Sequence, residues 1–344
     1  MTPDGRPDFA WALIGPGRIA GRFAEAVQAL PGCRLHAVQG RDPARAQAFA
    51  ARWSRPDRPP VRAHAALEAL LADPEVDGVY IATPHAFHGA AVRAALRAGK
   101  PVLCEKSLVP TRAEAEALVA LARERGLFLM EAVWTRFLPL YAQLGRWLAE
   151  GAIGPLCAIQ SSFCFPADYD PTGRLFDPAQ AGGALLDIGI YNLSVTRWLL
   201  QQALGACPEP IALHVDGVLA PSGVDQRVAA MLQFPGGISS QFVCALDCAA
   251  DNGLRVLGER GVISLPRDFW RATEASLQLH GSATVQRLEA PLRINGFEGE
   301  IEEAMRCIRA GLVESPLMPH AESLATLGWL DEMRRRLGVR YPFE

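Results

Sequence analysis

The first third of the chain alternates short apolar runs with longer amphipathic segments. A short continuous apolar run favours a buried strand, and apolar positions at helical spacing favour an amphipathic helix. Strands are predicted at 9–15, 34–40, 76–83, 101–106 and 127–133, and helices at 18–30, 42–53, 64–73, 86–99 and 111–126. Strands separated by helices in this way imply right-handed crossovers and a parallel, doubly wound sheet.

The pattern changes after about residue 135. A predicted helix at 138–151 is followed by strand-like segments at 156–165, 211–219, 226–234, 238–246, 254–258, 261–265, 275–280 and 284–289, and helices return at about 298–311 and 320–337. Turns such as FPGGI and GERGV join neighbouring strands, which indicates antiparallel pairing. We therefore predict an α/β protein with two domains: residues 1–133 with the parallel sheet, and residues 134–344 with α+β structure.

A glycine-rich turn, GPGRIA, follows the first predicted strand at residues 15–20. In this G-x-G-x-x-A spacing, Gly15 allows a tight turn, Gly17 lets the backbone approach a pyrophosphate, and small Ala20 lets the helix pack close to the strand. The helix N-terminus, with Arg18 and Ile19 in its first turn, then faces the phosphates. The strand–turn–helix context favours dinucleotide binding; the alternative is a tight turn in some other doubly wound protein.

The end of the second strand bears on which dinucleotide is bound. An NAD site usually carries Asp or Glu there to bond the ribose hydroxyls. Here the strand ends in VQGRD, so Gly40 and Arg41 stand in that place and Asp42 follows as a helix cap. Arg41 can pair with a 2′-phosphate, which favours NADP and leaves NAD possible; the alternative is an exposed loop arginine.

Lysine is rare in this chain. The 34 basic residues include only two lysines, Lys100 and Lys106, and the rest are arginines. An amine can give up a proton in a suitable environment, whereas a guanidinium effectively cannot. Lys106, which follows the apolar strand PVLCE, is therefore a candidate for acid–base chemistry. The alternative is a chance survivor of a strong arginine bias on a solvated turn.

A second chemical stretch is GGALLDIGIYNLSV at 182–195. Asp187 and Tyr191 are four residues apart, so a helix places them on one face, and both interrupt an apolar run. A buried aspartate needs a partner, and Lys106 is available. Together they suggest Tyr191 as the proton donor or acceptor, Lys106 as its activator or relay, and Asp187 as the group that holds Lys106. The alternative is an Asp cap and a core tyrosine.

Five separated motifs occur in the order and spacing of one known family. GPGRIA, TPHAFH, EKS after an apolar strand, MEAVWTRFLP and GGALLDIGIY resemble the Gfo/Idh/MocA oxidoreductases, in the branch that contains dimeric dihydrodiol dehydrogenase and NADP-dependent D-xylose dehydrogenase. The resemblance spans roughly residues 9–200. It implies an N-terminal Rossmann domain and a C-terminal domain with an open, mostly antiparallel sheet, whose outer face commonly forms a dimer contact.

The resemblance also implies roles for particular residues. The family's catalytic Lys, Asp and Tyr fall on Lys106, Asp187 and Tyr191, and Glu105 falls on the Glu that helps hold the nicotinamide end. The turn Thr83-Pro84-His85 falls where the family contacts the cofactor, with His88 on the next helix, although a packed His88 is the favoured interpretation.

Two positions depart from the family pattern. Residue 107 is Ser where the family usually has Pro after a Lys–Pro bond that is often cis, and a cis bond costs several kcal/mol more before Ser than before Pro. Either the bond is trans and the Lys106 backbone shifts, or a cis bond is tolerated here. Gly40 stands where NADP-preferring relatives often have Ser, so one phosphate hydrogen bond is expected to be missing.

Further residues are candidates for the active-site cleft, where Trp134 and Arg136 are expected to contact the cofactor and Trp134 also the substrate. Trp134 and Arg136 follow a strand end, where ligands gather in such sheets, with packing at a domain interface as the alternative. The segment SSFCFPADYDPTGRLFDP at 161–178 resembles the family's substrate-side loop and suits the apolar face of a sugar or cyclic diol. Its candidate pocket residues are Phe163, Phe165, Tyr169, Arg174 and Phe176.

Composition removes several classes of function. A net charge of −3 gives no electrostatic argument for nucleic acid or an anionic membrane. No apolar run reaches membrane-span length, and the N-terminus lacks a basic region followed by a long apolar run, so a cytoplasmic protein is expected. Eight cysteines without a CxxC pair fit reduced thiols, and the Cys and His spacing predicts no metal site.

These observations predict an NADP-dependent dehydrogenase, working as a homodimer, that transfers hydride between nicotinamide and a carbon-bound hydroxyl of a sugar or cyclic trans-diol. Two alternatives remain. One is a non-catalytic NADP-binding sensor of the same fold, against which the joint presence of Lys106, Asp187 and Tyr191 argues. The other is a sugar–sugar oxidoreductase that keeps its NADP tightly bound.

Overall fold

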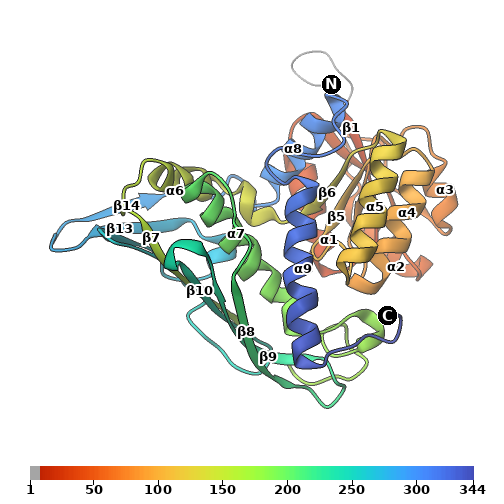
Figure 1. Cartoon of the computed structure of the whole chain (residues 1–344). Coiled ribbons are helices and arrows are strands. Elements are labelled where there is room, and N and C mark those ends of the chain that lie inside the picture. The colour runs from red at the N-terminus through yellow and green to blue at the C-terminus, as the bar shows by residue number, and fades with distance from the viewer. Residues whose placement is uncertain (1–7) are drawn as a thin grey trace. The chain divides into compact units, whose positions relative to one another are not determined.

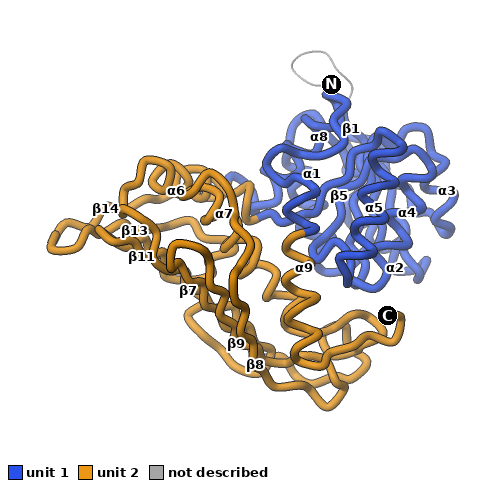
Figure 2. Tube along the Cα trace, in the orientation of Figure 1, with its two compact units in different colours: residues 1–134, 293–324 blue, residues 135–292, 325–344 orange. Residues whose placement is uncertain are grey.

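The computed structural model describes residues 8–344, so the start of the N-terminal stretch read for a signal peptide lies outside it. The chain divides into two compact units, which Figure 2 colours separately. The first comprises Met1–Trp134 and Arg293–Leu324, and the second comprises Thr135–Leu292 and Ala325–Glu344. Residues 293–324 therefore belong with the N-terminal part of the chain, whereas the sequence pattern had suggested one uninterrupted domain over 134–344.

The first unit is built on a parallel sheet with strand order β3-β2-β1-β4-β5-β6 in the described chain. Its strands are β1 (Phe9–Ile14), β2 (Cys33–Gln39), β3 (Arg62–His64), β4 (Gly78–Ile81), β5 (Val102–Glu105) and β6 (Leu129–Ala132). Its helices are α1 (Arg18–Ala29), α2 (Pro43–Trp53), α3 (Leu67–Leu71), α4 (His88–Arg97), α5 (Arg112–Arg125) and α8 (Glu298–Arg309) (Figure 1). The order reverses beside β1, so β1 and β4 meet at the point where such sheets bind ligands.

Local signals in the sequence place most of these elements. The Thr111 hydroxyl accepts a hydrogen bond from the Glu114 amide at the start of α5, and Gly126 ends that helix in the left-handed conformation, with φ of 61°. The predicted helix at 64–73 is wrong at its start, because residues 62–64 pair with β2 as an edge strand and α3 is correspondingly short.

The second unit is built on a mixed sheet with strand order β14-β13-β12-β11-β7-β10-β9-β8 in the described chain. Its strands are β7 (Leu156–Cys164), β8 (Ala212–Leu219), β9 (Asp225–Gln233), β10 (Ser239–Ala245), β11 (Leu254–Gly258), β12 (Gly261–Leu265), β13 (Glu274–Leu279) and β14 (Val285–Glu289). All neighbours are antiparallel except β7 and β10, which run parallel. The predicted fold class, with a parallel sheet followed by a mostly antiparallel one, is confirmed.

Two helical segments of this unit matter for the site. Helix α6 (Pro139–Ala149) packs against α7 (Ile190–Leu204), and the π-helical turn η4 (Leu185–Gly189) leads directly into α7. Residues 185–200 of this run are all buried, so its polar residues face protein groups rather than solvent. The last helix, α9 (His320–Leu337), is shared between the two units in sequence. Among the described residues, no helix combines the length and hydrophobicity needed to cross a bilayer.

Candidate active site

The turn between β1 and α1 can be made only with glycine at its first position. Gly15 has a φ of 90°, and a Cβ there would lie 2.9 Å from backbone atoms of Ala82 and Thr83 at the end of β4. Its amide donates to the Gln39 carbonyl at the end of β2. The turn is therefore held against the carboxyl ends of both neighbouring strands, where the glycine motif placed it.

The N-terminus of α1 is open. Gly17 is the N-cap residue, no side chain caps the helix, and a Cβ on Gly17 would meet no atom within 4 Å. The first amide groups of a helix have no partner inside it, and they attract anions. With Arg18 and Ile19 as the first helical residues, this end offers donors and space for a pyrophosphate.

The end of β2 explains why residue 40 is glycine. A Cβ on Gly40 would lie 2.7 Å from Cδ of Pro16, so a serine cannot be accommodated without moving the glycine-rich turn. Asp42 is used as the cap of α2, where it accepts from the amides of Ala44 and Arg45 at 2.9 and 3.2 Å. Arg41 places its guanidinium carbon 5.0 Å from the centre of the Phe87 ring.

The end of β4 presents a buried hydroxyl. Thr83 Oγ1 is buried and has no hydrogen-bond partner among residues 8–344, which is the kind of group that a cofactor amide or hydroxyl would satisfy. Pro84 precedes a short helical turn, η1 (His85–Phe87), in which His85 is buried. Thr83, Pro84 and His85 thus make up the turn that the motif TPHAFH predicted after β4.

His88 is buried beneath this turn and joins two strand ends. Its Nε2 lies 2.6 Å from the Thr83 carbonyl oxygen, and its Nδ1 lies 2.9 Å from the Ser107 carbonyl oxygen. Burial lowers the pKa of His88, although both carbonyl contacts favour its protonated form. The ring nitrogens thus contact the protein backbone, in agreement with the packed interpretation of this histidine.

The turn that carries Lys106 is fixed on both sides. The Lys106–Ser107 peptide bond is cis, which is the second of the two alternatives that the sequence left open. Glu105 accepts from the Tyr80 hydroxyl and, at 3.3 Å, from the Lys106 amide. On the other side, the Leu108 amide donates to Glu131 Oε1 at 2.8 Å. The lysine therefore projects from a backbone held by β4, β6 and α4.

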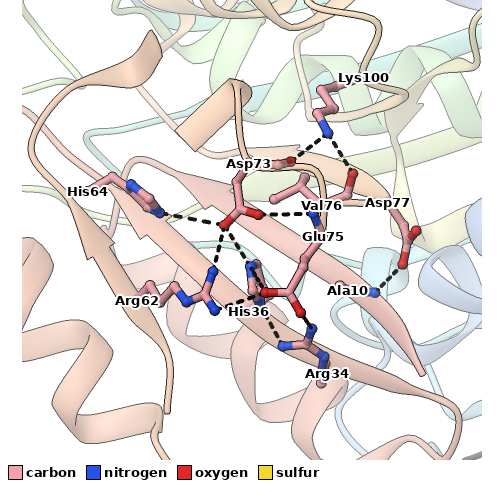
Figure 3. A network of polar contacts seen from close by, with 10 residues as sticks. All are labelled: Ala10, Arg34, His36, Arg62, His64, Asp73, Glu75, Val76, Asp77 and Lys100. Carbon is pink, nitrogen blue, oxygen red and sulfur yellow. Dashed lines mark hydrogen bonds and ion pairs between the residues drawn. The ribbon is translucent and has the colours of Figure 1, made fainter. Parts of the chain in front are cut away.

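The other lysine has an architectural role. Lys100 Nζ donates to the carbonyl oxygens of Asp73 and Val76, at 2.8 and 2.9 Å, as Figure 3 shows. Burial lowers the pKa of Lys100, and the charges of Asp73 and Asp77 oppose that change. Two carbonyl oxygens converge on one compact ammonium group. This contact explains a lysine at position 100 without a catalytic role.

The same region holds a group with metal-like composition. Single ligand atoms of His36, Asp73 and Glu75 lie within 4.8 Å of one another (Figure 3). However, Arg62 contacts both carboxylates, at 3.2 and 2.9 Å, and Arg34 lies 3.6 Å from Glu75. Burial acts to raise the pKa of Asp73, but the hydrogen bond from His36 and the charge of Arg62 bring it to about 2. The guanidinium groups thus supply the positive charge that a cation would bring.

In the second unit, Asp187 lies in η4 and Tyr191 at the start of α7, and both are buried. Asp187 Oδ1 accepts from Arg174 Nη1 at 2.8 Å. Arg174 belongs to the long segment after β7, where the sequence analysis placed the substrate loop. A residue proposed for the pocket is therefore an ion-pair partner of the proposed catalytic aspartate.

Tyr191 stands at the edge of an aromatic cluster. Its ring centre lies 5.6 Å from that of Phe163, which stacks on Trp270 with centres 3.4 Å apart and lies 6.4 Å from Phe165. Trp270 was missed by the sequence analysis, since an isolated Trp between strands carries no periodic signal. Farther along, Phe176 is buried against the half-exposed Tyr169.

Trp134 and Arg136 have contacts typical of packing. The Trp134 ring lies 5.1 Å from the Phe297 ring, with the Arg22 guanidinium 5.1 Å from its centre. Arg136 Nε and Nη2 donate to the Ser194 hydroxyl and carbonyl oxygens at 3.1 and 3.2 Å. Each of these contacts lies within one unit, and the expected place of both residues in the active-site cleft stays a prediction.

Comparison with known proteins identifies the same two parts. Residues 9–133 match the model of the GFO/IDH/MocA oxidoreductase family, NAD-binding Rossmann fold, and residues 141–264 match the GFO/IDH/MocA C-terminal domain. Trans-1,2-dihydrobenzene-1,2-diol dehydrogenase from Oryctolagus cuniculus is 37% identical over 337 residues, which cover 96% of this chain and 99% of that protein. The Homo sapiens enzyme is 36% identical, covering 96% and 98%.

Two solved structures are similar to this chain over 95% or more of its length. Aldose–aldose oxidoreductase from Caulobacter crescentus, complexed with glycerol, has a TM-score of 0.83 at 25% identity and covers 96% of this chain and 98% of its own. A 3-ketoreductase from Actinomadura kijaniata, in complex with NADP and TDP-benzene, has a TM-score of 0.81 at 28% identity, covering 95% and 97%.

Proposed function

The chain belongs to the GFO/IDH/MocA family of NAD(P)-binding oxidoreductases, and from this premise we propose that it is an NADP-dependent dehydrogenase of a sugar or a cyclic trans-diol. The reaction interconverts a carbon-bound hydroxyl and a carbonyl group. The substrate class rests on the full-length similarity to dihydrodiol dehydrogenases and on the aromatic surface of Phe163 and Trp270 beside Tyr191.

The residues of the first unit fit a dinucleotide. The uncapped start of α1 and the open space at Gly17 suit a pyrophosphate, and the unsatisfied Thr83 hydroxyl suits a polar group of the cofactor. When bound, NADP supplies the nicotinamide that accepts or returns a hydride. The choice of NADP over NAD rests on Arg41, because the acidic residue expected for NAD is absent and Asp42 is committed to its cap.

Lys106 and Tyr191 are proposed as the acid–base pair. In the oxidation direction the carbinol carbon loses its hydrogen with both electrons, and Tyr191 takes the hydroxyl proton after passing its own phenolic proton to Lys106, so that the carbonyl bond forms. Lys106 exchanges protons with Tyr191, which a guanidinium could not do. Asp187, oriented by Arg174, holds the charge of the pair in place. The observation that carries this proposal is the turn at Lys106, whose backbone is fixed from both sides.

A second candidate follows from the similarity to aldose–aldose oxidoreductase. In that case the protein would keep its NADP through the cycle, oxidising one sugar and reducing another. A nicotinamide that stays bound through purification and is reduced by one sugar and reoxidised by a second would distinguish it from a dehydrogenase that releases its cofactor.

We also propose a homodimer formed through the sheet of the second unit, and a cytoplasmic location. The dimer rests on the family expectation. The location rests on the spacing of the eight cysteines, which contains no CxxC pair and fits reduced thiols.

The test is a nicotinamide-absorbance assay with NADP and NAD over D-xylose, D-glucose, other aldoses and cyclic trans-diols. Turnover is expected with NADP, and Arg41→Ala is expected to reduce the preference over NAD. Lys106→Arg and Tyr191→Phe are expected to lower kcat by about 10² to 10⁴, the usual contribution of a general acid or base. Tyr191→Phe keeps the aromatic ring and removes only the hydroxyl.

Lys100→Arg is the matched control, since it makes the same chemical change at the architectural lysine and is expected to keep its activity per folded molecule. Wild-type kcat in Lys106→Arg would contradict the acid–base role. Tight NADP binding without turnover of any compound would favour the sensor alternative.

A further inference from the structure

The helical run that carries Asp187 and Tyr191 begins against a buried carboxyl group from another part of the chain. Asp225 is the first residue of β9 and is fully buried. Its Oδ2 accepts a hydrogen bond of 2.6 Å from the amide of Leu185, the first residue of η4. Asp225 is 40 residues away in sequence, so this contact exists only in the folded chain.

This contact takes the place of an ordinary helix cap. The residue before η4 is Ala184, whose side chain can accept no hydrogen bond. The first amides of a helix need acceptors from outside it, and a negative charge is favoured at that end. Asp225 therefore does from β9 what Ser, Thr or Asp usually does from the preceding position.

The two glycines before the run allow this approach. Gly183 has a φ of 123°, and a Cβ there would lie 2.4 Å from Asp225 Oδ1. A Cβ on Gly182 would lie 2.7 Å from the Leu175 carbonyl oxygen. Any other residue at either position would push the helix start away from the carboxyl group or from the segment that carries Arg174.

The C-terminal segment holds the same backbone from another side. The Tyr341 hydroxyl donates to the Gly182 carbonyl at 2.7 Å. The Arg334 guanidinium lies 4.7 Å from the centre of the Tyr341 ring and pairs with Glu344 at 2.7 Å. The helix start is thus fixed by β9 and by the chain end, while Arg174 fixes the Asp187 carboxylate itself.

We propose that Asp225 is a positioning residue for the reaction: its carboxyl group fixes the first turn of the run and thereby sets where Asp187 and Tyr191 stand. This inference rests on the proposed function for the roles of those two side chains. Asp225 touches neither substrate nor cofactor in this proposal, and it acts through its hydrogen bond with the Leu185 amide.

The test compares Asp225→Ala with Asp225→Asn. The asparagine amide oxygen can still accept from the Leu185 amide, whereas alanine cannot. Because a displacement of about 1 Å can cost up to about a hundredfold in rate, Asp225→Ala is expected to lower kcat by ten- to a hundredfold with KM nearly unchanged. Asp225→Asn is expected to keep most of the wild-type kcat. Thr111→Ala, which removes the cap of α5, is the matched control and is expected to keep kcat.

The rate of backbone-amide hydrogen exchange in peptides covering residues 183–192 reports on the helix start without any substrate. Exchange is expected to be faster in Asp225→Ala and near wild type in Asp225→Asn. Should Asp225→Ala fail to fold, Tyr341→Phe is measured instead, with a smaller loss of kcat in the same direction expected. Faster exchange together with an unchanged kcat would overturn the proposal, and so would unchanged exchange. A wild-type protein without turnover would refute the proposed function and leave the exchange result standing.

Discussion

Lys100 and Lys106, the two lysines among 34 basic residues, differ in what surrounds them. Lys100 ends at two convergent backbone carbonyls, which suit a compact ammonium better than a planar guanidinium. Lys106 sits on a turn whose backbone is bonded to His88, Glu105 and Glu131 through its neighbours and its own amide. The rarity of lysine in the sequence therefore draws attention to both residues. Only the contacts show that Lys100 has a structural role.

At the same scale, Asp225 should give stability a distinctive pH dependence. Burial raises the pKa of this carboxyl group from 3.8 to about 7, and Arg334 opposes the change. The charge of Asp225 also raises the pKa of Tyr341 and of Cys244, after the larger effect of burial. The folded state holds the proton to a higher pH than the unfolded chain does. The contribution of Asp225 to the free energy of unfolding is therefore complete below pH 4 and is lost as the pH rises through 7.

Asp225→Asn is therefore expected to flatten the fall in stability between pH 4 and 7, where one such group can contribute up to about 1.4 kcal/mol per pH unit. The measurement is the free energy of unfolding in urea at several pH values. Asp216→Asn, which removes an exposed carboxyl group on β8, controls for the loss of one negative charge. A slope in Asp225→Asn equal to that of the wild type would rule out the raised pKa.

At the scale of elements, the β1–α1 turn and the end of β2 constrain each other. The Pro16 ring fills the space that a side chain at residue 40 would occupy. The glycine at 40 is thus a consequence of the proline at 16, and the missing serine need not reflect a preference for NAD. Both residues are evident in the sequence, but only the structure shows that position 40 lies against the Pro16 ring.

This coupling predicts a non-additive pair of substitutions. Gly40→Ser is expected to weaken NADP binding, because the new side chain displaces the glycine-rich turn. Pro16→Ala/Gly40→Ser is expected to recover at least tenfold in affinity, or about 1.4 kcal/mol, since the clash is relieved. Fluorescence titration of NADP measures it, with Pro16→Ala alone as the control. Additive effects of the two changes would refute the coupling.

At the scale of the whole molecule, the first unit is completed by a distant part of the chain (Figure 2). Phe297, Ile301 and Ala304 of the 293–324 segment are buried. Arg22 and Asn295 exchange two hydrogen bonds, of 2.6 and 2.9 Å. The dinucleotide-binding unit thus depends on residues that follow the second sheet in sequence.

A fragment that ends at residue 134 is therefore expected to be less stable than the same fragment joined by a flexible linker to residues 293–324. Burying Phe297 and Ile301 is worth about 3 kcal/mol or more together. Urea unfolding of the two fragments measures the difference, and Ile301→Ala in the joined fragment should remove part of it. Equal stability of the two fragments would show that the segment is not needed by the first unit.

The sequence by itself determined the alternation of strands and helices, the glycine turn, the fold class and the family, because these depend on periodicity and on motifs of neighbouring residues. It also marked Lys106, Asp187 and Tyr191 as the candidates for chemistry. The tertiary structure decided the features that depend on long-range contacts. These are the edge strand at 62–64, the place of residues 293–324 in the first unit, the ion pair of Arg174 with Asp187, and the stacking of Trp270 on Phe163. A cap supplied from 40 residues away, such as Asp225, leaves no local pattern, because its partner is chosen by the fold.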